Sequence, residues 1–495
     1  MINTRISAGF NKVQELKCCC NVTDIKLHMA KNEGESCVIS VVSDKKLENA
    51  VLEVEKGNNG FTVEVEKEHF VSCNGVNWPD ALEPVKNFDI EANELTNILV
   101  RFTTTVNTEA GRYTFILALK DGDGNIVCNY TVRIKVWNFA LPEKYVINTA
   151  MGLSRVRISE KHGVTDPDEL QRLYEKYYEF LLKFRVSAYD MPYNALDDRA
   201  DKYMSDPRVT SFVLDIDKEV DDETLKKYHA KLSTNPEWMK KATFYPLDEP
   251  LNKEHLGMLI AKCERIKRLC PGVRRVSPFF RNIQFTKDTD EIEILLEHCE
   301  VLCPKITCFN DKFIYRLEEQ KEKYGSFQSR MDKAREEGKE VWQYVCWEPG
   351  KPYLNMYVDE SGLDHRILFW QQHMVGATGF LYWATTTWRS VKDPWTNMAT
   401  MPQLSPNVFG DGALLYNGNK VGIDGPCGSV RLDAVRDGME DCEMLRMADE
   451  VLGRDWVLAK VKAVTMDLMH YTESGDFFTA VRNEIGNELE KALNK

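Results

Sequence analysis

The first 140 residues alternate between hydrophobic and polar positions over short stretches. These stretches are rich in β-branched and aromatic residues and cover residues 35–44, 50–57, 61–73, 97–106, 112–121 and 129–139. A period of two places one face of a strand in the core and the other in solvent, so each stretch predicts a β-strand. The sequence KDGDGN at 120–125 has the composition of a hairpin turn. Strands of this length and spacing predict an antiparallel β-sandwich over residues 1–140.

From residue 141 on, strand-like hydrophobic segments alternate with longer segments of helical period. Segment 166–184, for example, begins with Asp and carries apolar residues at helical spacing. Eight segments have the strand pattern, namely 145–151, 186–193, 211–217, 242–250, 274–280, 301–309, 341–349 and 379–388. Eight strands that alternate with helices predict a (β/α)8 TIM-like barrel over residues 141–428. No nucleotide-binding glycine motif follows any of these strands, which argues against a Rossmann fold.

The last part of the chain, residues 429–495, changes pattern again. Its apolar residues recur at helical spacing and no strand-like segment interrupts them. We therefore expect a C-terminal helical segment that packs on the barrel or on the sandwich.

Composition narrows the classes of partner and cofactor. A formal net charge of -13 argues against nucleic acid and against an anionic membrane surface, because phosphate-rich partners select clustered Lys and Arg. The sequence contains no run of about 18 apolar residues, so no membrane span is predicted. The N-terminal residues lack the apolar stretch of a secretion signal, so we expect a cytoplasmic protein. The 14 cysteines, including those at 18–20, are irregularly spaced and predict reduced thiols, with no metal site and no other cofactor.

Polar and aromatic side chains gather where the predicted barrel strands end, which is where such barrels place their active sites. The most distinctive are the adjacent carboxylates Asp248 and Glu249, in the stretch FYPLDEP. The other candidates, all near strand ends, are Asp190, Tyr193, Arg281, Tyr344, Trp347, Tyr382, Trp383 and Trp388. Carboxylates transfer protons and aromatic faces cover the C–H face of a sugar ring. The set therefore predicts a carbohydrate site.

The carboxylate pair has two interpretations. Adjacent residues on a strand point to opposite faces, so Asp248 and Glu249 reach one ligand only if the chain bends at the strand end. Such a pair suits hydrolysis in which the 2-acetamido oxygen of the substrate is the nucleophile. One carboxylate then orients the acetamido group, and the charge of Asp248 raises the pKa of Glu249 and keeps it protonated as the acid. The second interpretation is a helix start, where acidic residues favour the first turn.

Several longer motifs resemble those of glycoside hydrolase family 123, in order and in spacing. They include YPLDEP at 245–250, WQYVCWEPGKPYLNMYVD at 342–359, RILFWQQHMVGATGFLYWATTTW at 366–388 and GPCGSVRLDAVRDGMEDCEML at 425–445. The resemblance runs from about Asn97 to the C-terminus. It implies the same order of β-sandwich, barrel and helical tail.

The resemblance also implies a reaction. Members of this family release β-linked N-acetylgalactosamine with retention, by participation of the acetamido group and without a metal. On that basis Asp248 orients the acetamido group and Glu249 is the general acid/base. Tyr344 or Tyr382 would hydrogen-bond the acetamido carbonyl, and Trp383 would form the floor under the sugar. Two alternatives stay open: a hexosaminidase or other glycosidase of the same barrel that acts on a different sugar, and a non-catalytic glycan-binding protein.

Overall fold

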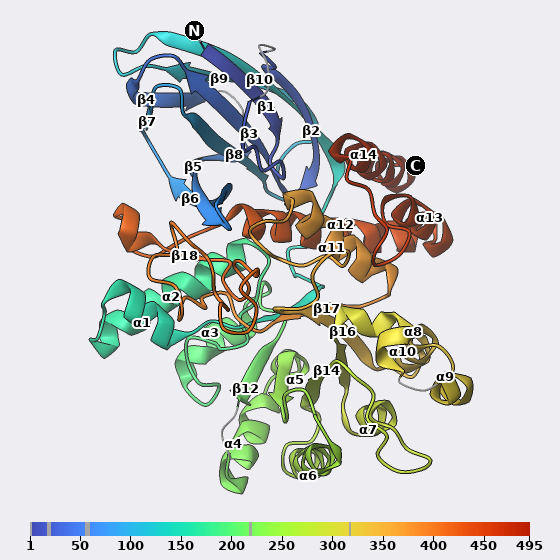
Figure 1. The fold of residues 1–495 in the computed structure, drawn as a ribbon. Helices are drawn as coiled ribbons and strands as arrows, with labels where there is room; N and C mark the ends of the chain where they lie inside the picture. Colours follow the sequence, from blue (N-terminus) through green and yellow to red (C-terminus); the bar gives the residue numbers. More distant parts are fainter. Residues whose placement is uncertain (1, 17–20, 55–59, 217–219, 316–317) are drawn as a thin grey trace.

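The computed structural model describes residues 2–16, 21–54, 60–216, 220–315 and 318–495. Figure 1 shows a β-sandwich at the top, which carries the N-terminus, and a barrel-like α/β domain below it. The helices of the C-terminal segment lie at the junction of the two and beside the sandwich. The three kinds of structure follow one another along the chain in the predicted order.

The N-terminal domain is a sandwich of two sheets. One sheet has the order β1 (Ile2–Ala8), β3 (Gly34–Ser43), β8 (Leu95–Thr104), β5 (Phe61–Cys73) and β6 (Val76–Pro84), and the other has the order β2 (Asp24–Lys31), β10 (Ile126–Ala140), β9 (Gly111–Lys120), β4 (Leu47–Val54) and β7 (Phe88–Ile90). Alternate residues such as Val132, Ile134 and Val136 are buried between the sheets, as the period of two predicts. The predicted hairpin is confirmed because β9 and β10 pair antiparallel. β2 departs from the antiparallel pattern, since it runs parallel to β10.

The second domain is built on a parallel sheet that curves into a barrel. Its order is β11 (Asn148–Met151), β17 (Gly379–Tyr382), β16 (Glu340–Val345), β15 (Val301–Pro304), β14 (Arg274–Phe279), β13 (Ala242–Tyr245) and β12 (Phe212–Ile216). Side chains from alternate positions of these strands, among them Val276, Cys303 and Trp342, fill the interior as one cluster. The barrel interior is therefore a packed core, and any cavity has to lie at one of its ends.

The predicted eight-stranded barrel is confirmed only as a nearly closed parallel barrel of seven strands. Residues 186–193, expected to be the second strand, form no strand. The backbone N–H of Tyr189 donates to Met151 of β11 at 3.0 Å, and Tyr189 accepts from the N–H of Val213 of β12 at 2.9 Å. This segment therefore spans the gap between the two edge strands. Pro192 has no N–H with which to continue a ladder, which explains why the contact stays short.

Helices cover the outside of the barrel. They are α1 (Arg155–His162), α2 (Pro167–Lys183), η1 (Asp198–Ala200), α3 (Asp201–Ser205), α4 (Asp222–Leu232), α5 (Pro236–Lys241), α6 (Lys253–Leu269), α7 (Glu291–His298), η2 (Ile306–Phe309), α8 (Asp311–Ile314), α9 (Glu318–Tyr324), α10 (Phe327–Glu336) and α11 (Gly362–Met374). The start of α2 has a local cause, because the Asp166 side chain accepts from the N–H of Glu169 and Pro167 occupies the first turn. After β17, a long loop contains the small hairpin of β18 (Tyr416–Asn417) and β19 (Pro426–Cys427), with η3 (Gly418–Val421) between them.

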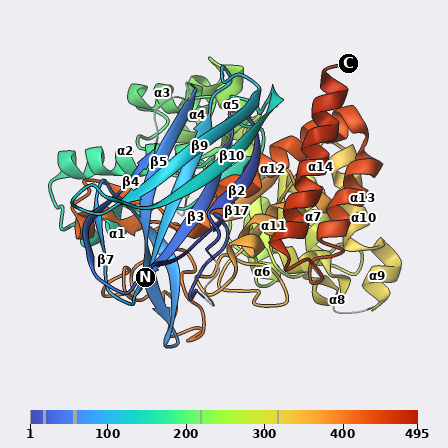
Figure 2. The same ribbon diagram turned by 90° about the horizontal axis from the view of Figure 1, so that it is seen from above.

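The C-terminal segment consists of α12 (Val430–Leu452), α13 (Arg454–Val464) and α14 (Gly475–Leu493). Helix α12 lies under the sandwich in Figure 1. Figure 2 shows α13 and α14 beside the sandwich. The indole of Trp137 on β10 donates to Asn487 of α14 at 2.9 Å. The helical tail thus contacts the sandwich as well as the barrel.

The junction between sandwich and barrel is made largely of buried charges on α12 and its neighbours. Arg366 of α11 forms ion pairs with Glu35 of β3 at 2.8 Å and with Asp441 of α12 at 2.7 Å. Arg482 of α14 contacts the same Asp441 at 2.6 Å. Burial opposes the ionisation of Asp441, but the two guanidinium groups outweigh it and hold its pKa at about 2.

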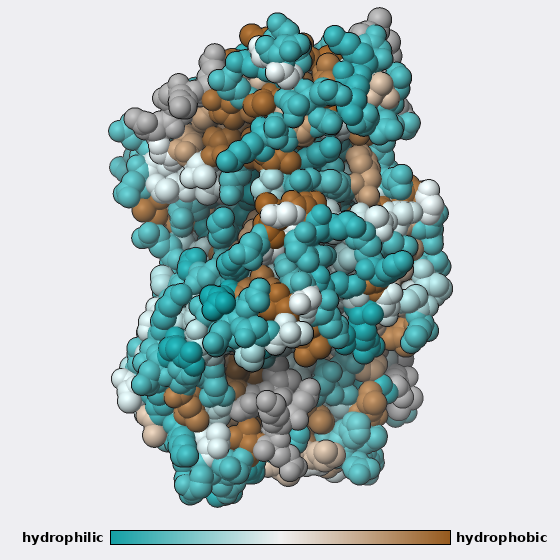
Figure 3. All heavy atoms as spheres, turned by 90° about the vertical axis from the view of Figure 1, so that its left-hand side faces the viewer, coloured by the Kyte–Doolittle hydropathy of each residue, from teal (hydrophilic) through white to brown (hydrophobic). Residues whose placement is uncertain are grey.

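The remaining surface and thiols show few special features. The hydrophilic residues predominate on the face drawn in Figure 3, and hydrophobic residues gather mainly over the sandwich. In the part of the chain that the structure describes, no helix is long and apolar enough to cross a membrane. The cysteines of that part are free thiols, most of them buried. The cysteines at 18–20 lie outside the described residues.

Candidate active site

The two adjacent carboxylates lie in a turn directly after β13. This strand ends at Tyr245, and Glu249 has a φ of 39°, which bends the chain in the left-handed region. Helix α6 begins later, at Lys253, and its cap is Asn252, whose side chain accepts from the N–H of His255. Asp248 and Glu249 therefore belong to the turn at the strand end and do not cap the helix.

Both carboxylates line one cavity of about 340 Å³ at the carboxyl ends of the barrel strands. Its walls are mostly aromatic and apolar, and the lining residues are Tyr189, Tyr245, Asp248, Glu249, Pro278, Tyr344, Cys346, Trp347, Leu381, Trp383 and Met401. A concave, largely apolar pocket with a few polar groups is typical of a small-ligand site. The volume is within the range that one sugar ring and its substituents require.

Tyrosines of the barrel interior hold the two carboxylates. The hydroxyl of Tyr245 donates to Oδ1 of Asp248 at 2.7 Å, and the hydroxyl of Tyr344 donates to Oε1 of Glu249. Asp248 is exposed to the cavity, whereas Glu249 is half-buried. The two neighbours thus occupy different environments, which is the usual condition for two carboxyl groups to have different roles.

The environment of Glu249 shifts the pKa of its carboxyl group upward. Burial raises the pKa of this carboxyl, and the nearby charge of Asp248 raises it further. The Tyr344 hydroxyl and the more distant cations Lys305 and Arg281 act in the opposite direction, but they do not cancel the rise. The expected direction of the pKa shift is confirmed, although burial contributes more to it than Asp248 does.

Comparison with known proteins identifies the chain. The model of the glycoside hydrolase 123 catalytic domain matches residues 189–448, which is more than half of the 495 residues. The chain belongs to glycoside hydrolase family 123. That match contains the Asp248–Glu249 turn and every barrel strand from β12 to β17.

One solved structure agrees with this membership at the level of the fold. A family 123 glycoside hydrolase from Clostridium perfringens, described in a study of glycolipid glycan hydrolysis, aligns over 100% of this chain and 98% of its own, with 12% identity and a TM-score of 0.67. A β-D-glucuronidase from Dictyoglomus thermophilum aligns over 82% of this chain and 89% of its own, with 10% identity and a TM-score of only 0.32. No curated protein sequence matches the chain.

The structure brings five of the predicted site residues of this family 123 protein together. Asp248, Glu249, Tyr344, Trp347 and Trp383 all line the cavity. They lie at or just after the ends of β13, β16 and β17. Asp248 and Trp383 are separated by 135 positions in sequence, but all five residues converge at one end of the barrel.

The other predicted residues lie outside the cavity lining. Tyr382 is fully buried behind it, Arg281 covers the ring of Phe280, and Trp388 is buried with its indole N–H on the carbonyl of Leu415. Tyr193 donates to Glu175 at 2.5 Å. Asp190 is exposed, and its carbonyl accepts from Tyr174. A role for these five in substrate binding stays a prediction.

Several lining residues were not among the predicted set. Tyr189 and Tyr245 belong to the cluster that fills the barrel interior. Tyr245 is the last residue of its strand, so the alternation along β13 is the signal that would have found it. Met401, in the long loop after β17, carries no comparable signal.

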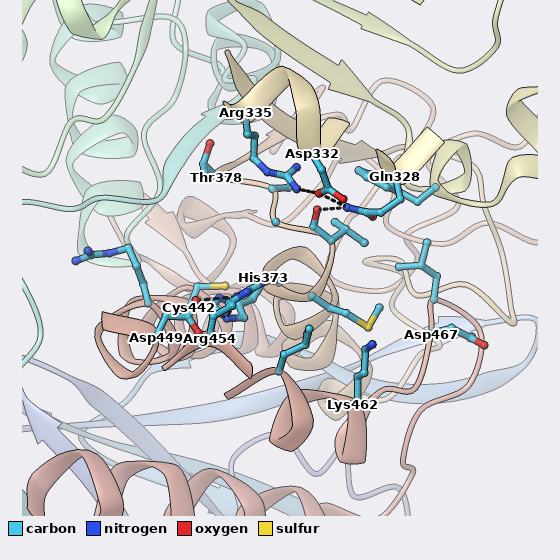
Figure 4. Close-up of a pocket in the computed structure, with 18 of the residues that line it drawn as sticks. Gln328, Asp332, Arg335, His373, Thr378, Cys442, Asp449, Arg454, Lys462 and Asp467 are labelled. Atoms are coloured by element: carbon cyan, nitrogen blue, oxygen red, sulfur yellow. Dashed lines mark hydrogen bonds and ion pairs between the residues drawn. The ribbon is translucent and has the colours of Figure 1, made fainter. Parts of the chain in front are cut away.

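A second and larger cavity, of about 690 Å³, lies on a different part of the molecule, between α10, α12, α13 and the start of β17. In Figure 4, Arg335 and Asp332 lie on one side of it, and His373 and Arg454 lie on the opposite side. Arginines engage two of its carboxylates, since Arg335 contacts Asp332 and Arg454 contacts Asp449 at 2.7 Å. The cavity with Asp248 and Glu249, whose hydrogen bonds come from tyrosine hydroxyls, is the better candidate for acid catalysis.

Proposed function

We propose that this protein is a retaining β-N-acetylgalactosaminidase. It would release β-linked N-acetylgalactosamine from the end of a glycan, and the 2-acetamido group of the substrate would be the nucleophile. The observation that carries the proposal is the position of Asp248 and Glu249, adjacent in one turn and lining the same aromatic cavity. Enzymes that use a protein nucleophile or a general base for water place their two carboxyl groups on opposite sides of the glycosidic bond.

The two carboxylates would divide the work. Glu249, with its raised pKa, would protonate the leaving oxygen and then activate water to open the oxazolinium intermediate. Asp248, held by Tyr245, would accept a hydrogen bond from the acetamido N–H and stabilise the positive charge that develops on the ring. Trp383 and Trp347 offer flat apolar surfaces for the sugar.

The source of the sugar is part of the proposal. The structurally similar Clostridium perfringens enzyme is described in terms of glycolipid glycans. We therefore propose a glycan of a glycolipid or another glycoconjugate as the natural substrate. The net charge of -13 favours a neutral glycan over a strongly anionic one.

A panel of aryl β-glycosides tests the proposal. We expect cleavage of the N-acetylgalactosaminide, cleavage of the N-acetylglucosaminide at least about tenfold slower, and no cleavage of the galactoside, which lacks the acetamido nucleophile. The first product seen by proton NMR should be the β-anomer. Equal cleavage of the galactoside would contradict acetamido participation. Preference for another sugar would support the first alternative, and binding without any turnover would support a glycan-binding protein.

Replacing Tyr344 with Phe is expected to move the alkaline limb of the kcat/KM–pH profile to higher pH. The general acid has to be protonated, so activity falls as the pH rises through the pKa of Glu249. The Tyr344 hydroxyl stabilises the ionised carboxylate, and its removal raises that pKa further. Tyr353→Phe is a matched control, because the Tyr353 hydroxyl bonds Asn310 outside the cavity. A limb that moves to lower pH in Tyr344→Phe would refute the assigned contact.

A further inference from the structure

Trp383, which forms one wall of the cavity, is held from three directions. Its indole N–H donates to the carboxylate of Asp411, at 3.2 Å to Oδ1 and 3.1 Å to Oδ2. Its backbone carbonyl accepts from the hydroxyl of Tyr189 at 2.8 Å. Its ring edge lies against Gly412, where an added Cβ would come within 2.4 Å of the ring and where φ is +68°. The orientation of this wall therefore depends on where residues 411 and 412 are held.

Arg431 holds the loop that contains Asp411. Its Nη1 donates to the carbonyl of Gly410 at 2.9 Å, and its Nη2 donates to the carbonyl of Ala413 at 2.6 Å. The two carbonyls flank Asp411 and Gly412 in the chain, so one guanidinium fixes both ends of the short segment. Arg431 is the second residue of α12 and is fully buried.

Asp80 of the N-terminal sandwich in turn holds Arg431. Asp80 lies on β6 and is fully buried. It accepts from Nε of Arg431 at 2.9 Å and from Nη2 at 2.8 Å, and the hydroxyl of Tyr416 donates to it at 2.5 Å. With a further bond from Nη1 to the carbonyl of Met356, all five N–H groups of the guanidinium are used. A planar, fully bonded guanidinium has one orientation, so its position is fixed by the sandwich on one side and by the loop on the other.

We propose that Asp80 is a positioning residue for the active site, and that the N-terminal sandwich shapes the sugar-binding wall through Asp80, Arg431, the loop 410–413 and Asp411. Among the described residues of the sandwich none lines the cavity, so this assigns to the sandwich a role in catalysis that is exerted at a distance. It rests on the proposed function in one respect, namely that the cavity wall formed by Trp383 contacts the sugar. The series of hydrogen bonds from Asp80 to Trp383 does not depend on which sugar is bound.

The indole N–H of Trp383 provides a direct readout of the proposal. The full-length protein is labelled with ¹⁵N at tryptophan, and the Trp383 signal is assigned by its loss in Trp383→Phe. Asp80→Asn keeps the shape of the side chain but removes the charge that orients Arg431, so the Trp383 indole signal is expected to shift. On a substrate that the enzyme turns over, KM is expected to rise about tenfold, because a displaced Trp383 wall would bind the sugar less tightly.

Asp433→Asn is the matched control. Asp433 is also a buried carboxylate at the junction of sandwich and α12, where it pairs with Arg101 at 2.6 Å, but the hydrogen bonds that involve it do not reach the loop 410–413. It should lower stability without moving the Trp383 signal or KM. Equal shifts in the two variants, or no shift in Asp80→Asn, would overturn the proposal.

A milder variant covers the case in which Asp80→Asn does not fold. Tyr416→Phe removes one hydrogen bond to Asp80 and leaves the ion pair with Arg431 in place. A shift of the Trp383 indole signal in Tyr416→Phe relative to the wild-type protein supports the proposal, and an unchanged signal contradicts it. If the protein hydrolyses no glycoside but the Trp383 signal responds as described, the proposed function fails and the positioning by the sandwich stands.

Discussion

Replacing Glu249 with Gln is expected to lower kcat/KM for a β-N-acetylgalactosaminide by about 10²- to 10⁴-fold, the usual contribution of a general acid. Gln has the same size and preserves the cavity, but it has no proton to give to the leaving oxygen. The loss should be larger for an alkyl or sugar leaving group than for a nitrophenyl group, whose oxygen needs little protonation. Initial rates on the two kinds of substrate measure both effects.

The control for this variant lies a few residues further along the chain. Glu254 is exposed in the first turn of α6 and does not line the cavity, so Glu254→Gln should retain full activity. Thermal unfolding of both variants checks that the fold is intact. Unchanged hydrolysis by Glu249→Gln would show that Glu249 is not the acid.

Replacing Arg366 with Met is expected to reduce the free energy of unfolding by about 3–5 kcal/mol, the cost of leaving buried charges without their partner. Arg366 is 2% exposed and forms ion pairs with Glu35, Asp437 and Asp441. Met fills similar space but neutralises none of the three carboxylates. Denaturant unfolding followed by circular dichroism gives the change. The pKa of Asp441 should also rise, since Arg366 helps to hold it at about 2.

An exposed arginine provides the comparison for Arg366. Arg133 on β10 pairs with Asp24 on β2 at the surface of the sandwich, and each side chain is about half exposed. Arg133→Met should change the stability by less than about 1 kcal/mol, because solvent screens such pairs. Similar losses in the two variants would mean that the buried network contributes no more than surface charge does.

The largest gap between sequence and structure concerns α12. Its sequence, with charged residues throughout VRLDAVRDGMEDCEML, has the composition of an exposed helix, yet all of these positions are buried. Their partners include Asp80 and Arg101 of the sandwich and Arg366 and Arg482 of other helices. Burial of a charge depends on a partner, and here the partners are up to 351 positions away in sequence, so no local pattern reveals them.

The barrel shows a similar limit. The strand segments other than 186–193 were found from their pattern, because a buried strand is hydrophobic regardless of its neighbours. Whether 186–193 pairs as a strand depends on the separation of β11 and β12, which the rest of the barrel sets.

The sequence by itself indicated the order of β-structure, alternating strands and helices, and helical tail, as well as the family, and it drew attention to the adjacent carboxylates Asp248 and Glu249, because strand period, helix caps and motif spacing are properties of contiguous residues. Tertiary structure alone decided that Asp248 and Glu249 face one cavity, since this follows from the bend at Glu249 and from tyrosines on β13 and β16. It also decided that Tyr382 and Trp388 lie away from the cavity lining while their neighbour Trp383 reaches it. Successive residues after a strand diverge in direction, and only the packing around them fixes which one reaches the cavity.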